Sequence, residues 1–279
     1  MQSLLLLMCI SSNASPIVSC AYENWAQYRD VKVLPEEIDP ELCTHIAFAY
    51  AHITKTGLET TEFNDLDMYS RMQKLRLKNP SLKLLLSVTA PKPEAQPSTT
   101  VGTIKMEAFD TTTSVAETDM TISTLNNDDL WLQIPSLGLS WINATLDFIT
   151  VNGFDGIDLN PTNNHQLDNY WDELMNHDFI TFVQDLQTHF NAVDKLVTMT
   201  AVNEEMLRPE VSLAELCAAL DFVNLHQFNI PQPLNGFNSH VTLNTAKEIT
   251  EWWLGNGCAA EKVTLGFSTF GNAFVGLAL

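Results

Sequence analysis

Basic residues are scarce in this chain. Its 279 residues include 14 Lys and Arg against 34 Asp and Glu, which gives a formal net charge of -20 at pH 7. Phosphate backbones and anionic lipid head groups repel so acidic a surface, so the composition argues against nucleic acid and membranes as partners. A neutral ligand, or no small ligand at all, suits this charge better.

Long apolar runs are also missing. The run Leu4–Ile10 is too short to span a bilayer, and no later stretch is long enough. Small polar residues follow it, and Ser12-Asn13-Ala14 resembles a small-x-small cleavage site. This pattern predicts a secretory signal peptide over residues 1–14 and an extracellular protein over residues 15–279. The alternative is a buried N-terminal strand or helix.

Motifs for metals and cofactors are lacking too. The seven histidines are scattered and no His-Glu-x-x-His pattern occurs, so we expect no metal site. Gly255–Ala260 has the letters of a dinucleotide fingerprint, but it follows a predicted helix and precedes a predicted strand. Phosphate binding needs the reverse order, so we expect no cofactor.

Short apolar runs do alternate with helical patterns along the chain. The strand-like runs cover residues 16–20, 45–51, 83–88, 154–159, 196–202, 222–228 and 263–268. Strict alternation of strand and helix favours βαβ units and a parallel sheet. Seven strands with apolar residues on both faces favour a (β/α) barrel, with an open sheet as the alternative. Residues 91–130, rich in Ser, Thr, Asp and Glu, interrupt the alternation as a polar insertion.

Five cysteines are present, and Cys9 lies in the predicted signal peptide. The remaining four are Cys20, Cys43, Cys217 and Cys258. An even number in an oxidising compartment predicts disulfides, with three connectivities open. Cys217 and Cys258 each precede adjacent predicted strands, and we expect them to pair; two buried thiols are the alternative. Asn143-Ala144-Thr145 is a usable N-glycosylation sequon in a secreted protein.

The stretch GFDGIDLNPT, Gly153–Thr162, is typical of a buried strand that carries carboxylates to its end. It resembles the FDGxDxDxE strand of the glycoside hydrolase family 18 chitinases and chitinase-like lectins. Further matches are CAYENWAQYR at residues 20–29, IDPELCTH at 38–45, KNPSLK at 78–83 and KVTLGF at 262–267. The resemblance extends from about Ser15 to the last residues.

The resemblance implies an α/β fold, a TIM (β/α)8-type barrel. Because the chain stops at Leu279, it also implies a barrel truncated after strand 7, without the family's small inserted α+β domain. Two unpaired strand edges would then remain, so we expect either a fragment or a partner that covers the gap. Cys20 and Cys43 match a disulfide of the family.

Family members hydrolyse β-1,4 N-acetylglucosamine polymers by a substrate-assisted route. The resemblance places the proton-donating acid at Thr162 and the acetamide-steadying carboxylate at Asn160. A threonine hydroxyl cannot act as a general acid, a role worth about 10²–10⁴ in rate. Asp155 and Asp158 remain, and we expect them to accept hydrogen bonds in the barrel interior. We therefore predict a protein that is not an enzyme, with residual hydrolysis as the alternative.

The aromatic residues that stack on sugars in the family are partly kept. The resemblance assigns substrate binding to Trp25, Tyr50, Phe228 and Asn229. It implies weak binding of chitin or N-acetylglucosamine oligosaccharides, whereas packing of these rings within the barrel is the alternative. A protein-interaction or signalling scaffold, with a protein partner and no sugar binding, is another candidate function.

Overall fold

The computed structural model describes residues 5–8, 16–91, 130–161, 174, 176–201, 212–226 and 243–268. Most of the predicted polar insertion, residues 92–129, lies outside these ranges. So do three of the candidate site residues, Thr162, Phe228 and Asn229.

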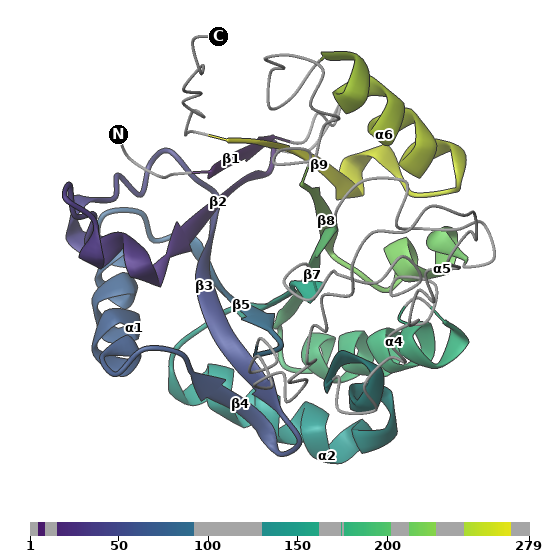
Figure 1. Ribbon diagram of the computed structural model, residues 1–279, viewed down its shortest axis with the longest axis horizontal. Coiled ribbons are helices and arrows are strands. Elements are labelled where there is room, and N and C mark those ends of the chain that lie inside the picture. The colour runs from purple at the N-terminus through teal and green to yellow at the C-terminus, as the bar shows by residue number, and fades with distance from the viewer. Residues whose placement is uncertain are drawn as a thin grey trace, which may run out of the picture.

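Seven parallel strands form a ring at the centre of the molecule (Figure 1). They are β2 (Val18–Glu23), β3 (His45–Thr54), β5 (Lys83–Thr89), β6 (Gly156–Leu159), β7 (Leu196–Ala201), β8 (Phe222–Leu225) and β9 (Val263–Phe267). Each pairs in parallel with the next. All seven predicted strands are confirmed, and the barrel rather than the open sheet is the arrangement.

A short N-terminal strand completes the ring. β1 (Leu5–Met8) lies between β2 and β9 and runs antiparallel to both, with Leu6 opposite Cys20 on one side and Phe267 on the other (Figure 1). The gap expected after the seventh parallel strand is therefore occupied, because β1 supplies backbone partners for both edges. These residues fall within the predicted signal peptide, which itself stays a prediction.

One further strand was not expected from the sequence. β4 (Gly57–Thr60) folds back on the end of β3 as an antiparallel hairpin. The turn needs Gly57, whose φ of 129° is a conformation that L side chains rarely adopt. The hairpin packs against α2 (Leu130–Val151) on the outside of the ring.

The helices surround the ring (Figure 1). Besides α2 they are α1 (Asp65–Gln73), α4 (His177–Asn191), α5 (Leu213–Ala218) and α6 (Leu243–Gly255), with 3-10 turns η1 (Asn24–Tyr28), η2 (Pro35–Glu37), η3 (Lys74–Leu77) and η6 (Ala260–Lys262). α2 is kinked at Gly138, where φ is 51° and ψ is -137°. Within the described residues, no helix has both the length and the apolar character needed to span a membrane.

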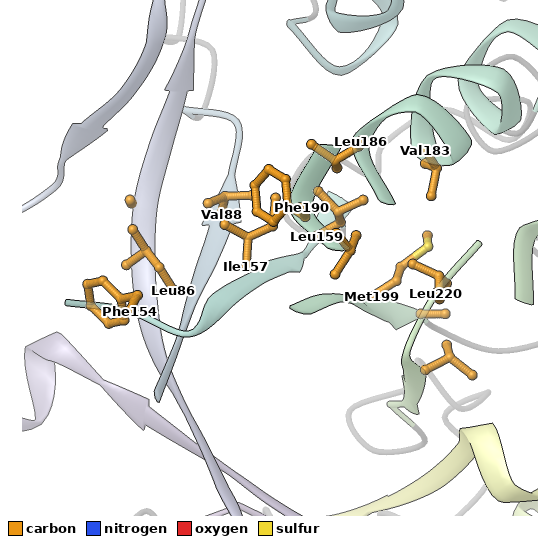
Figure 2. Packing of buried hydrophobic residues seen from close by; sticks show 14 of the residues in the cluster. Leu86, Val88, Phe154, Ile157, Leu159, Val183, Leu186, Phe190, Met199 and Leu220 are labelled. Atoms are coloured by element: carbon orange, nitrogen blue, oxygen red, sulfur yellow. The ribbon is translucent and has the colours of Figure 1, made fainter. Parts of the chain in front are cut away.

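The main hydrophobic core lies between the ring and the helices. Figure 2 shows Val88, Ile157 and Leu159 gathered around Phe190 of α4. A smaller apolar cluster of Ala47, Leu85 and Phe222 comes from alternate strand positions. Because alternate residues of a strand point to opposite faces, this second cluster lies inside the ring, toward the N-terminal ends of the strands.

Two disulfides fasten the structure. Cys20 is bonded to Cys43, with Cα atoms 6.1 Å apart, and Cys217 to Cys258, with Cα atoms 5.4 Å apart. Both predicted pairs are confirmed. The second joins the end of α5 to the segment between α6 and β9, so it ties two consecutive βα units together.

Candidate functional site

A fully buried carboxylate, Asp158, organises the polar interior of the ring. Its Oδ1 accepts hydrogen bonds from the Thr198 hydroxyl at 2.8 Å and from the Asn224 amide at 3.3 Å. Its Oδ2 accepts from the hydroxyls of Ser87 at 3.0 Å and Thr200 at 2.8 Å. Burial raises the pKa of Asp158, and these four hydrogen bonds oppose that shift.

The register of the parallel strands brings this network together. Ser87 is paired with Asp158 across β5 and β6, and Asp158 with Thr198 across β6 and β7. Neighbouring strands therefore present polar side chains at one level of the barrel interior. None of these four donors carries a charge, so among the described residues neutral dipoles solvate the carboxylate.

Asp155, at the other end of the same strand, is held differently. Its carboxylate pairs with the Arg76 guanidinium and accepts the Leu84 N–H at 2.7 Å. The following residue must be Gly156, because a Cβ there would collide with the backbone carbonyl of Leu196. The expectation that both aspartates accept hydrogen bonds in the barrel interior is thus wrong for Asp155. It joins η3 to the N-terminal ends of β5 and β6, where the charged Arg76 reaches it.

Asn160 lies just beyond the C-terminal end of β6 and is buried. Its N–H donates to the Val88 carbonyl at 2.9 Å, which continues the ladder with β5. Its side-chain amide donates to the Ser87 hydroxyl at 3.5 Å, and the same amide lowers the pKa of the Tyr50 hydroxyl. The amide therefore links the Asp158 network to an aromatic ring at the end of the barrel.

Tyr50 and Trp25 form an aromatic pair at this C-terminal end. Their ring centroids lie 5.7 Å apart with the planes inclined by 31°. Trp25 belongs to η1, which directly follows β2, and Tyr50 stands at a shift of register between Ala49 and Ala51 in β3. Such a bulge changes the direction of a side chain at the end of a strand. Both rings are half-buried.

Glu23, the last residue of β2, completes the group, and the sequence analysis assigned it no role. Its carboxylate lies 3.4 Å from the Arg29 guanidinium, and both Arg29 and Trp25 lower its pKa. Burial raises the pKa of Glu23 against these two contacts. Its charge and that of Asp158 both raise the pKa of Tyr50, after the larger effect of burial, so both carboxylates are near enough to act on the tyrosine.

A signal for Glu23 was present in the sequence. Cys20 and Tyr22 point outward, because Cys20 is bonded to Cys43 and Tyr22 packs against Phe48 in the outer core. The period of two therefore directs Ser19 and Glu23 inward. An inward carboxyl at the C-terminal end of a barrel strand occupies the usual position of functional residues.

The C-terminal end of the barrel thus offers two chemistries. The Trp25–Tyr50 pair presents apolar ring surface, and Glu23 and Asn160 present hydrogen-bonding groups beside it. Such a combination suits a ring-shaped polar ligand with one apolar face. His226, just after β8, is half-buried, and desolvation lowers its pKa to about 4, so it is uncharged at neutral pH. The described residues contain no cluster of three His, Cys, Asp or Glu that could hold a metal ion.

Comparison with known proteins identifies relatives over nearly the whole chain. The sequence profile described as Glycosyl hydrolases family 18 matches residues 17–278. Chitotriosidase-1 of Mus musculus is 27% identical and aligns with 96% of this chain. Chitinase-3-like protein 2 of Homo sapiens is 23% identical, also over 96% of this chain. The chain spans 56% of the length of the first relative and 66% of the second.

Solved structures show the same fold at low sequence identity. The Group IV chitinase of Ostrinia furnacalis, in complex with allosamidin, superposes with a TM-score of 0.62 at 19% identity. Human YKL-39, described as a pseudo-chitinase with retained chitooligosaccharide binding, superposes with a TM-score of 0.62 at 20% identity. Each alignment covers 88% of this chain and 64% of the other.

Proposed function

This chain belongs to glycosyl hydrolase family 18, and on that premise we propose that it is a secreted chitinase-like protein that binds chitin or N-acetylglucosamine oligosaccharides weakly and does not hydrolyse them. The observation that carries the proposal is the Trp25–Tyr50 pair, whose rings stand beside Asn160 at the C-terminal end of the barrel. Pyranose rings stack on aromatic faces while their hydroxyl groups hydrogen-bond to neighbouring polar groups.

Two positions of the family's motif lack the groups that hydrolysis needs. The acid position is Thr162, whose hydroxyl has too high a pKa to protonate a leaving oxygen at neutral pH. The acetamide-steadying position is Asn160, whose amide lowers the pKa of the Tyr50 hydroxyl and carries no negative charge. A cation that develops on the acetamide would therefore lack its counter-charge at this point.

Secretion is supported by independent features. Two disulfides suit an oxidising compartment, and the sequon residue Asn143 is exposed on α2. The predicted signal peptide contains β1, so cleavage after Ala14 would free the facing edges of β2 and β9. Intact-mass measurement of the natural product decides whether residues 1–14 are removed and whether Asn143 carries a glycan.

Isothermal titration with chitin oligomers tests the binding. We expect measurable heat with the parent protein and a loss of affinity of about tenfold or more for Trp25→Ala, because stacking buries apolar ring surface. Trp252→Ala is the matched control: Trp252 is also half-buried but lies on α6, on the outside of the ring. The proposal is contradicted if the parent gives no heat at millimolar ligand. It is also contradicted if Trp25→Ala and Trp252→Ala lose affinity equally.

A fluorogenic chitobioside tests the absence of hydrolysis in the same preparations. We expect no release above that of a heat-killed sample, because the acid position lacks a carboxyl group. Release by the parent above that level would show that another group donates the proton.

A further inference from the structure

We propose that this site prefers glucosamine units with a free ammonium group, as in deacetylated chitin oligomers, over fully acetylated units. The inference rests on the proposed function, since it names the substrate class of the same site. It starts from a residue that the motif comparison left without a role, Glu23.

The first step is the position of the Glu23 carboxylate. Glu23 ends β2 on the inward face, its side chain is 30% exposed, and in the pairing of β2 with β3 it lies opposite Ala49, the neighbour of Tyr50. It therefore stands at the edge of the aromatic pair, within reach of a group carried by a sugar stacked on that pair. An amine on such a sugar can donate a charge-assisted hydrogen bond to this carboxylate.

The second step is the chemistry of the rings themselves. The faces of Trp25 and Tyr50 attract cations, and the attraction grows when the cation leaves water. An acetamide group gains nothing from this attraction because it is neutral. An ammonium group on the same sugar carbon is attracted by the ring faces and can also contact the Glu23 carboxylate.

The third step is the charge around the pair. Both Glu23 and Asp158 act on Tyr50, and the four hydrogen-bond partners of Asp158 are neutral. Arg29 is the cation that faces Glu23, through one contact of 3.4 Å with 47% of its side chain exposed. An ion pair that is this exposed contributes little free energy. An ammonium group can therefore displace Arg29 from Glu23 at a small cost in free energy. The net charge of -20 also favours the approach of a cationic oligomer.

Titration calorimetry with glucosamine pentamer and N-acetylglucosamine pentamer tests the preference, in low salt at a pH where the amines are protonated. We expect the deacetylated pentamer to bind about tenfold more tightly. Glu23→Gln should abolish most of that difference, because it removes the charge but keeps a hydrogen-bonding side chain, so the ratio of the two affinities is the quantity to compare. Glu59→Gln is the matched control, because it removes the same charge from an exposed position on β4.

The outcomes separate the two proposals. If neither pentamer binds, the proposed function fails and this inference fails with it. If the acetylated pentamer binds as tightly as the deacetylated one or more tightly, sugar binding stands and the preference is wrong. If Glu59→Gln lowers the preference as much as Glu23→Gln, the attraction comes from the acidic surface as a whole, and the assignment to Glu23 is overturned.

Discussion

Asp155 and Asp158 stand three residues apart, yet their carboxylates are stabilised by opposite means. Asp155, at the N-terminal end of β6, pairs with the cation of Arg76 and remains partly exposed. Asp158, inside the ring, is fully buried and is surrounded by hydroxyl and amide donors. One end of the barrel is thus fixed by an ion pair between secondary elements, whereas the interior toward the other end depends on a network of neutral dipoles.

This difference matches the division of labour in barrels of this kind, where the N-terminal face gives stability and the C-terminal face carries function. The Ala47, Leu85 and Phe222 cluster fills the ring on the first side. On the second side the interior is polar and leads through Asn160 to Tyr50 and Trp25. Substitutions that disrupt the contacts of Asp155 or of Asp158 should therefore lower the free energy of unfolding by different amounts.

The largest effect is expected from Asp158→Ala. The substitution leaves four buried donors without their common acceptor, and we expect a loss of about 3–5 kcal/mol in the free energy of unfolding. Urea denaturation measures it, with Asp147→Ala on the exposed face of α2 as a control that should stay within about 0.5 kcal/mol. A loss below about 1 kcal/mol would mean that the donors rebuild the network by themselves.

A smaller effect is expected from Arg76→Ala at the opposite end. Arg76 donates to Asp155, to the Gly153 carbonyl at 3.0 Å and to the Leu82 carbonyl at 3.3 Å, all partly exposed. We expect a loss of about 1–3 kcal/mol by the same measurement, with sugar affinity unchanged. Lys247→Ala breaks an exposed pair on α6 and should cost no more than about 0.5 kcal/mol. If Arg76→Ala cost more than Asp158→Ala, the contrast between the two ends would be reversed.

The smallest effect concerns pH. Burial lowers the pKa of His45, at the start of β3, to about 4, with a further contribution from Lys83. The unfolded chain binds a proton near pH 6.5 and the folded chain does not, so stability falls as the pH drops from about 6.5 toward 4. The titration of His45 alone lowers the free energy of unfolding by about 1 kcal/mol at pH 5.5. Denaturation of the parent and of His45→Asn at pH 7.0 and 5.5 measures it, and an unchanged difference in the variant would refute the assignment.

Much of the fold could be predicted because each parallel strand has a local sequence pattern. The seven parallel strands are short apolar runs between helical patterns. Cys217 and Cys258 each precede adjacent predicted strands, whereas the Cys20–Cys43 pair was implied by the family resemblance. β4 escaped prediction because Gly57–Thr60 has too little apolar alternation to be distinguished from a turn. β1 was expected only as an alternative, a buried N-terminal strand or helix, because an apolar run near the N-terminus also fits a secretory signal.

The candidate site was harder to predict, because its residues meet only through the closed ring. Trp25, Tyr50 and Asn160 come from three different strands or their ends, and no local pattern reports that they touch. Asp155 could have been separated from Asp158, since positions three apart on a strand face opposite sides. Glu23 lies in the stretch CAYENWAQYR, in which Trp25 is the residue that the family resemblance assigns to sugar binding.

The antiparallel strand at the seam of the barrel has a consequence for the order of assembly. Residues Leu6–Met8 pair with Leu265–Phe267, so two segments that lie far apart in the sequence meet at this seam. Closing so long a loop is slow compared with pairing between consecutive units. During translation β1 can hold only its contact with β2, and the cylinder becomes complete after the ribosome has delivered β9.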